Sequence, residues 1–305
     1  MSHSEPFISV GPPPPTLLAG ALELVYESLP ATTRRQVIAD LRQAAARGER
    51  SLAGLFAAWH QNDLLGAVLT EIFPGQSASL WPLRLAPGGP LQVAQRLLKH
   101  ALDWLEGQGV ELVQCLLATD SGDDAERLRA AGFAHACDLL CLASEADRFP
   151  TAPVDTALRF AAVTRTAIND LAHIIEQTYE HSLDCPMMDA LRDCRQVVAG
   201  YAATCRDDLS HWYMVRHAQE SVGCLLLGHD ATGKTWEVVY MGLTPAVRGH
   251  GWGLDVVRHA QWLVRERQGE RLLLAVDAAN DPALRVYAAA GFTTWDRNSV
   301  FVKTL

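Results

Sequence analysis

Hydrophobic and polar positions along this chain follow two patterns, one typical of helices and one typical of strands. Strand-like runs separated by the polar Gln61-Asn62-Asp63 predict a hairpin. For the first half we expect strands at 7–10, 52–60, 64–73, 79–85 and 110–117, and helices at 17–29, 37–46, 91–106 and 123–131.

The same order of elements returns in the second half, which indicates an internal repeat. There we expect strands at 158–163, 212–216, 222–227, 236–243 and 271–276, and helices at 167–180, 186–199, 252–267 and 281–290. Short sequences recur at a separation of about 160 residues. They pair Leu85-Ala86-Pro87 with Leu243-Thr244-Pro245, Gln108-Gly109 with Gln268-Gly269, and Ala130-Ala131-Gly132-Phe133 with Ala289-Ala290-Gly291-Phe292.

The segment 144–155 has linker composition, with Pro150 and Pro153 among small and charged residues. Two domains suit a chain of 305 residues. We therefore predict domains at 1–146 and 155–305.

Charge and composition exclude several classes of protein. The formal net charge of -9 argues against a nucleic-acid partner, because phosphate binding needs a clustered basic surface. The apolar runs are strand-sized and the N-terminus lacks a basic-then-apolar signal, so we expect a cytoplasmic protein with no membrane partner. Nothing indicates an oligomer, although one is possible.

Cysteine and histidine spacing gives no metal motif. Seven cysteines include no CxxC pair, and free buried thiols are the expectation. Eleven histidines show neither an HExxH spacing nor partner cysteines at zinc-finger distances, so we predict no metal cofactor.

The sharpest chemical signal is a glycine-rich segment between an expected strand and an expected helix. It reads Arg248-Gly249-His250-Gly251-Trp252-Gly253. Glycines let successive N–H groups converge, and a helix start adds unpaired donors, so the segment suits a pyrophosphate. A P-loop would need a Gly-Lys-Ser/Thr ending, and the dinucleotide fingerprint has another glycine spacing and an all-parallel setting. Asp277 after the next strand fits the dinucleotide alternative, but the three strands expected in a meander before the helix do not, so we reject that alternative.

These residues resemble the GNAT acetyltransferase superfamily. Its acetyl-CoA motif, Arg/Gln-x-x-Gly-x-Gly/Ala after a strand ending in apolar-x-Pro, is matched at every fixed position of 248–253. Asn280, Tyr287 and the pair Gly291-Phe292 also fit the family's downstream pattern. Within the superfamily, the tandem layout, Glu237 and the ending at 291–295 look most like the mycothiol synthase family, chiefly over 237–295.

The resemblance implies a mixed α/β (α+β) fold class: two tandem GNAT folds, each a mixed, splayed central sheet flanked by helices. It further implies acetyl-CoA or another acyl-CoA as co-substrate, held by the loop 248–253 and by Asn280. Backbone N–H groups of Met241 or Leu243 would contact the oxyanion by fold analogy.

Acyl transfer to an amine needs a base, because an ammonium is no nucleophile, and the departing thiolate benefits from a proton. Glu237 is the candidate base, since a carboxylate in an apolar strand has a raised pKa. The alternative is an exposed glutamate on an edge strand. Tyr287 is the candidate acid, and a core tyrosine is its alternative. His250 receives no catalytic role.

The acceptor side is less specified by the sequence. Tyr179, His181 and Asp184, in the segment joining two expected helices, are candidate substrate contacts, and Cys185 beside them is expected to be a spectator thiol. A small-molecule amine is the favoured acceptor. A protein N-terminus or lysine, or a non-catalytic CoA-binding or scaffolding module, are the alternatives.

The first half departs from the family where the cofactor would bind. Gly88-Gly89-Pro90-Leu91-Gln92 replaces the glycine cradle, and Pro90 removes a donor N–H. Leu128 stands in the place of Tyr287, and Ser121 lies near that of Asn280. We expect a degenerate, non-catalytic first domain.

Overall fold

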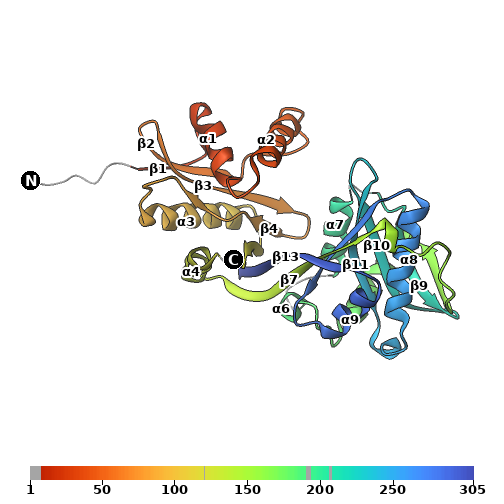
Figure 1. Ribbon diagram of the computed structural model, residues 1–305. Coiled ribbons are helices and arrows are strands. Elements are labelled where there is room, and N and C mark those ends of the chain that lie inside the picture. The colour runs from red at the N-terminus through yellow and green to blue at the C-terminus, as the bar shows by residue number, and fades with distance from the viewer. Residues whose placement is uncertain (1–7, 120, 190–193, 206–207) are drawn as a thin grey trace, which may run out of the picture. The chain divides into compact units, whose positions relative to one another are not determined.

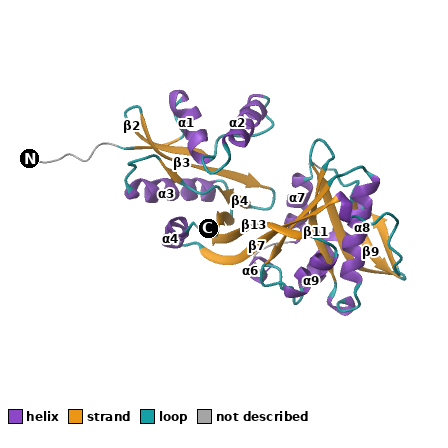
Figure 2. Cartoon of the chain, viewed as in Figure 1, coloured by secondary structure: helices purple, strands orange, loops and turns teal. Residues whose placement is uncertain are grey.

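A computed structural model of the protein describes residues 8–119, 121–189, 194–205 and 208–305 (Figures 1 and 2). The chain divides into two compact units, Met1–His135 with Val300–Leu305, and Ala136–Ser299. The expected division was 1–146 and 155–305. It differs because two strands that the sequence patterns did not indicate, β7 (Ala134–Glu145) and β13 (Thr293–Thr304), each run from one unit into the other.

The first unit is a mixed sheet between two layers of helices. Its strands run in the order β1 (Ser9–Gly11), β2 (Leu55–His60), β3 (Asp63–Phe73), β4 (Ser77–Leu80), β6 (Leu112–Ala118) and the end of β13, with β5 (Arg84–Leu85) paired to β3. Its helices are α1 (Pro15–Val25), α2 (Ala31–Ala46), α3 (Leu91–Gly107) and α4 (Gly122–Ala130).

Alternation along β2 explains these layers. Leu55 and Ala57 pack with α1 and α2, whereas Phe56 and Ala58 pack with α3 in a separate core. Successive side chains of a strand point to opposite faces, so a fully apolar strand needs cover on both.

The second unit repeats this architecture. Its sheet order is β13, β7, β12 (Arg271–Asp277), β11 (Thr235–Leu243), β10 (Glu220–His229), β9 (Trp212–His217) and β8 (Leu158–Ala162). One core lies under α5 (Ile168–Tyr179) and α7 (Cys194–Thr204), and the other under α8 (Trp252–Glu266) and α9 (Asp281–Ala289). The short α6 (Pro186–Asp189) follows α5; the expected helix 186–199 lies partly outside the described residues.

The sheet of the second unit opens between its two central parallel strands. β11 pairs with β12 only from Thr235 to Glu237, opposite Arg271 to Leu273. A register irregularity at Leu226/Leu227 of β10 bends β11 at the same level, as a bulge does. Beyond Glu237 the two strands diverge, which is the expected splay.

Among the described residues, no helix is both long and apolar enough to cross a bilayer.

Candidate functional site

The glycine-rich loop lies between the end of β11 and the first turn of α8. Gly249 and Gly251 have φ angles of 84° and 81°. A Cβ at either position would meet nothing within 4 Å, so the left-handed backbone, rather than crowding, requires glycine. Among the described residues, no hydrogen-bond acceptor faces the N–H groups of Gly249, His250, Gly251 and Trp252. Such N–H groups at a helix start form an anion site.

The Arg248 side chain anchors this loop instead of lining it. Its Nε donates to the Leu243 carbonyl at 3.0 Å. Its Nη1 donates to the carbonyls of Glu180 and His181, at 2.8 and 3.1 Å, and its Nη2 to that of Thr178 at 2.7 Å. The last three acceptors belong to the C-terminal end of α5, where a helix leaves carbonyls unpaired and favours a cation. Arg248 therefore holds the loop against α5.

The remaining loop residues also keep to local contacts. His250 is exposed, its Nδ1 lies 3.1 Å from the Val247 carbonyl, and its ring centroid lies 5.3 Å from that of Trp252. At Gly253 a Cβ would come within 3.6 Å of Val286 on α9. That distance is an ordinary van der Waals contact, so the packing of α8 on α9 does not itself require glycine here.

The splayed edge of β11 offers backbone donors to the gap. Thr244 donates its N–H to the carbonyl of Val222, within β10, at 2.9 Å. N–H groups of an antiparallel strand alternate between its two edges, so Thr244 and Gly242 face β10, whereas Leu243 and Met241 face the opening towards β12. Both residues predicted for oxyanion contact thus lie at the splay.

Glu237 sits where pairing of β11 with β12 ends, opposite Leu273 on β12 and Gly228 on β10. Its side chain is exposed. Nonetheless, desolvation by the surrounding protein raises the pKa of its carboxyl above the ordinary value. It is close enough to Cys205, the residue after α7, to raise the pKa of that thiol further. The carboxyl therefore lies near α7, beside the splay.

Tyr287 lies in α9 and is 7% exposed, in the core beneath α8. Burial, and then the charge of Asp184, raise the pKa of its phenol, which stays protonated at neutral pH. Asn280 caps α9: its Oδ1 accepts the N–H of Ala283 at 3.3 Å, and its side chain lies beside the Asp184 carboxylate. Asn280 and Tyr287 thus meet at Asp184, whereas Glu237 is not among their contacts.

The segment after α5 docks on the end of β12. Asp184 Oδ1 accepts the N–H of Asp277 at 2.8 Å, and Asp277 Oδ2 accepts that of Cys185 at 3.0 Å. His181 is exposed with a φ of 54° and offers its carbonyl to Arg248. Two of the predicted acceptor contacts therefore have a structural role. Asp184, through its carboxylate, and His181, through its backbone carbonyl, hold this segment in place.

Cys185 forms a disulfide with Cys137 on β7, so the expectation of a spectator thiol is wrong for Cys185 and that of free thiols wrong for this pair. The cysteines lie 48 residues apart, with no motif to indicate them. Cys115 and Cys224 are free and buried, as expected.

An aromatic cluster next to Tyr179 was not predicted from the sequence. Tyr240 of β11 stacks on Tyr201 of α7 with centroids 5.5 Å apart, and Tyr179 meets Tyr240 edge-on at 6.0 Å. Thr178 hydrogen-bonds Tyr240 at 2.7 Å. Tyr240 stands three positions after Glu237 on the same strand. A tyrosine this close to a candidate base was the sequence signal from which the cluster could have been predicted.

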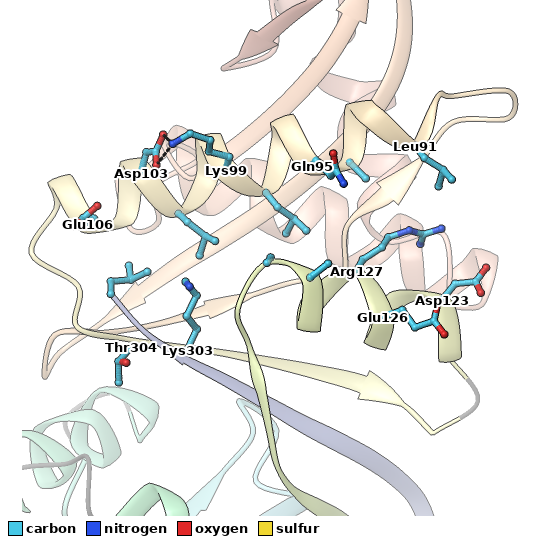
Figure 3. A pocket seen from close by; sticks show the side chains of 16 residues that line it. Leu91, Gln95, Lys99, Asp103, Glu106, Asp123, Glu126, Arg127, Lys303 and Thr304 are labelled. Carbon is cyan, nitrogen blue, oxygen red and sulfur yellow. Dashed lines mark hydrogen bonds and ion pairs between the residues drawn. The ribbon is translucent and has the colours of Figure 1, made fainter.

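The first unit lacks this arrangement. The N–H of Gly89 is paired with the Ala86 carbonyl at 2.8 Å, Pro90 caps α3, and Leu128 is buried in the core. This unit instead holds a cavity of about 870 Å³ between α3 and α4. Figure 3 shows Lys303 reaching into it, with Leu91 at its rim. None of the predicted site residues lines it.

Residues 168–292, from the start of α5 to just after α9, match the Acetyltransferase (GNAT) family. This match lies within the second unit and covers less than half of the chain. The family expected from the loop 248–253 is confirmed for this part of the chain. A mycothiol acetyltransferase of Acidothermus cellulolyticus is 33% identical over 94 residues. That match covers 30% of this chain and 28% of the relative, which is less than a third of either.

Solved structures extend the likeness of the GNAT domain to the whole fold. A GCN5-related N-acetyltransferase from Sphaerobacter thermophilus has a TM-score of 0.65 at 16% identity, over 97% of this chain and 95% of that one. A tandem GNAT protein from the clavulanic acid biosynthesis pathway has a TM-score of 0.53 at 15% identity, over 98% of both. The predicted fold class, two tandem GNAT folds, is confirmed.

Proposed function

We propose that the second unit transfers an acetyl or similar acyl group from acyl-CoA to an amine of a small molecule, within a ternary complex. The observation that carries the proposal is the cradle of unpaired N–H groups at Gly249–Trp252, next to the splay beyond Glu237. The cradle suits the CoA pyrophosphate, and the splay suits the pantetheine arm. The residues present therefore fit acyl-CoA as co-substrate.

The reaction needs a general base for the acceptor and a general acid for the departing thiolate, one on each side of the splay. Glu237 takes a proton from the acceptor ammonium, directly or through water, and the amine nitrogen then attacks the thioester carbonyl carbon. N–H groups of Met241 or Leu243 stabilise the charge on the carbonyl oxygen. As the C–S bond breaks, the Tyr287 phenol supplies a proton to the CoA sulfur, and the second proton released from the amine nitrogen restores the phenol. The Asn280 side chain already caps α9 and contacts Asp184. It would therefore bind a pantetheine amide in addition to these contacts.

The acceptor would enter beside α5 and α7. Tyr179 and Tyr240 present aromatic surface there, and the segment carrying His181 and Asp184 closes one side. The name of the mycothiol acetyltransferase relative favours a small-molecule acceptor. That match spans 28% of the relative, and the acceptor panel below tests the class of acceptor directly.

Titration calorimetry with acetyl-CoA tests the cofactor site. Gly251→Asp places a side chain and a negative charge in the cradle and strains a φ of 81°. We expect wild type to bind and this variant to lose binding. Gly233→Asp is the matched control, because Gly233 has a φ of 69° and open space in a turn of the same unit. No binding by wild type, or equal loss in both variants, would refute the assignment.

Turnover separates an enzyme from a CoA-binding module. Release of CoA thiol is measured with a panel of small amines and with peptides bearing a free N-terminus or lysine. Acetyl-CoA binding without release for any acceptor, unchanged in Glu237→Gln, would favour the non-catalytic module. Release with peptides alone would favour a protein acceptor.

A further inference from the structure

Three metal-ligating side chains that are separated in the sequence converge in the second unit. Asp208 and His211 lie in the segment before β9, and His229 ends β10. One donor atom from each falls within 4.8 Å of the other two. The Leu227 N–H donates to the His211 carbonyl at 3.1 Å, which ties this segment to β10. The three groups therefore sit on backbone that the sheet holds.

In two of the three residues, His229 and Asp208, local hydrogen bonds occupy one polar atom and leave a second one facing the cluster. His229 Nδ1 lies 2.8 Å from the Asp230 carbonyl, so this nitrogen carries the proton and Nε2 is the free donor. Nε2 lies 3.9 Å from Asp208 Oδ2. The other oxygen of Asp208 accepts the Ser210 N–H at 2.9 Å, which orients the carboxylate. A backbone carbonyl behind a metal-binding imidazole is the usual orienting contact.

His211 supplies an independent observation. Its Nδ1 is buried and has no hydrogen-bond partner among the described residues. Buried polar atoms nearly always have a partner, so an orphaned imidazole nitrogen calls for one. Both imidazoles pack on the Trp236 ring, with centroid distances of 4.7 Å for His211 and 4.8 Å for His229. This contact limits their rotation.

We propose that Asp208, His211 and His229 bind one divalent transition-metal ion of the Zn²⁺ type, leaving a fourth position for water. Two imidazoles and one carboxylate are a common ligand set for such an ion. Donors on one tetrahedral zinc lie about 3.4 Å apart, so the His229–Asp208 pair must close by about half an ångström. Arg267, whose charge acts on His211, opposes the ion. Cation binding must therefore overcome this charge.

The ion would join the segment before β9 to the end of β10, one residue from the pair Gly228–Glu237. Its binding is independent of the proposed acyl transfer. A second group, Cys137, Cys185 and Asp277, also has donors within 4.8 Å. Its two sulfurs are joined as a disulfide, which leaves no thiolate for a metal while the protein is oxidised. The test must nevertheless distinguish the two places.

The experiment is a titration of the oxidised, metal-free full chain with Co²⁺ alone, followed by visible absorption, and with Zn²⁺ by calorimetry. We expect one ion per chain. His229→Gln and Asp208→Asn should each weaken binding at least tenfold. The matched control is His173→Gln, because His173 also faces a carboxylate, Glu176 at 3.6 Å, but without a second imidazole. Its binding should equal that of wild type.

Thermal unfolding gives a second readout. Zn²⁺ should raise the melting temperature of wild type and of His173→Gln, and leave those of His229→Gln and Asp208→Asn unchanged. The metal-free melting temperatures of these two exposed substitutions report whether they fold. Binding that survives in both variants overturns the proposal. So does a thiolate-to-metal absorption band that disappears in Cys185→Ser, because the ion would then sit at the cysteine pair.

Discussion

Arg248 stands at the first position of the loop motif, where it could either position the loop or contact the phosphate. Replacing it distinguishes these two roles. In the structure the guanidinium donates to four backbone carbonyls, three of them at the end of α5, between Thr178 and His181. A side chain so engaged positions the loop N–H groups rather than contacting phosphate. Arg248→Ala should therefore release the loop from α5 before any ligand is added.

The size of the effect follows from those contacts. A hydrogen bond contributes about 0.5–1.5 kcal/mol net. Because Arg248 is exposed, we take the lower end, and four bonds amount to about 2 kcal/mol. If the loop must be re-formed on binding, acetyl-CoA affinity falls about 30-fold. Arg248→Lys should recover only part of this, because a single ammonium cannot reproduce the planar fork.

Hydrogen exchange of the ligand-free protein distinguishes the two roles. We expect Arg248→Ala to accelerate exchange of backbone amides at 178–185 and 249–254, with acetyl-CoA affinity reduced in parallel. The control is Arg265→Ala, which removes an exposed arginine from the far end of α8 and should leave both properties unchanged.

Either of two results would refute this reasoning. Unchanged exchange together with lost affinity would mean that Arg248 contacts the phosphate directly when ligand is present. Wild-type affinity in both Arg248 variants would mean that the loop keeps its shape without the anchor.

Three further perturbations follow from the second unit. Glu237 must lose a proton to act as base, so with its raised pKa the rise of kcat/KM with pH should lie above the ordinary glutamate range. Glu237→Gln should abolish that limb and lower kcat/KM by about 10²–10⁴; a surviving limb contradicts the role. Burial lowers the pKa of His259 to about 4 from 6.5, so the unfolded state binds the proton more readily and stability is lost as pH falls. Allowing for partial exposure, going from pH 7 to 5 should cost about 1–2 kcal/mol by urea denaturation, and His259→Phe should cancel that loss. Cys185→Ser should lower the free energy of unfolding by about 2–4 kcal/mol relative to Cys141→Ser, and equal values would argue against a stabilising disulfide.

The strongly patterned elements of the second unit were predictable from sequence. The expected helix 252–267 is α8 within one residue, and the expected strand 236–243 is β11 within one. Both have a clear period, and the glycine loop between them has its own backbone requirement. Gly249 and Gly251 do adopt positive φ angles. Local pattern and local conformation agree there.

β7 and β13 were not predictable because their environment changes along their length. Each runs from one unit into the other, so no single alternation of apolar and polar residues describes it. In β13, Thr293 to Arg297 are exposed, whereas Val300 to Val302 are buried. Alternation of apolar and polar residues therefore indicates at most part of such a strand. The contacts of Asp184 with Asp277 and of Cys185 with Cys137 are likewise long-range in sequence.

These long-range contacts connect the loop 248–253, proposed to hold the cofactor, with residues 180–185, proposed to line the acceptor side and called the acceptor segment below. Arg248 binds the carbonyls of 178–181, Asp184 then binds the end of β12, and Cys185 is joined covalently to β7. Asn280 and Tyr287 follow that end of β12 and meet Asp184. Ordering of the loop by a bound pyrophosphate would therefore also order the acceptor segment. Coupling between two binding sites is reciprocal. Acceptor binding should therefore increase the affinity for acyl-CoA by the same factor by which acyl-CoA binding increases the affinity for the acceptor.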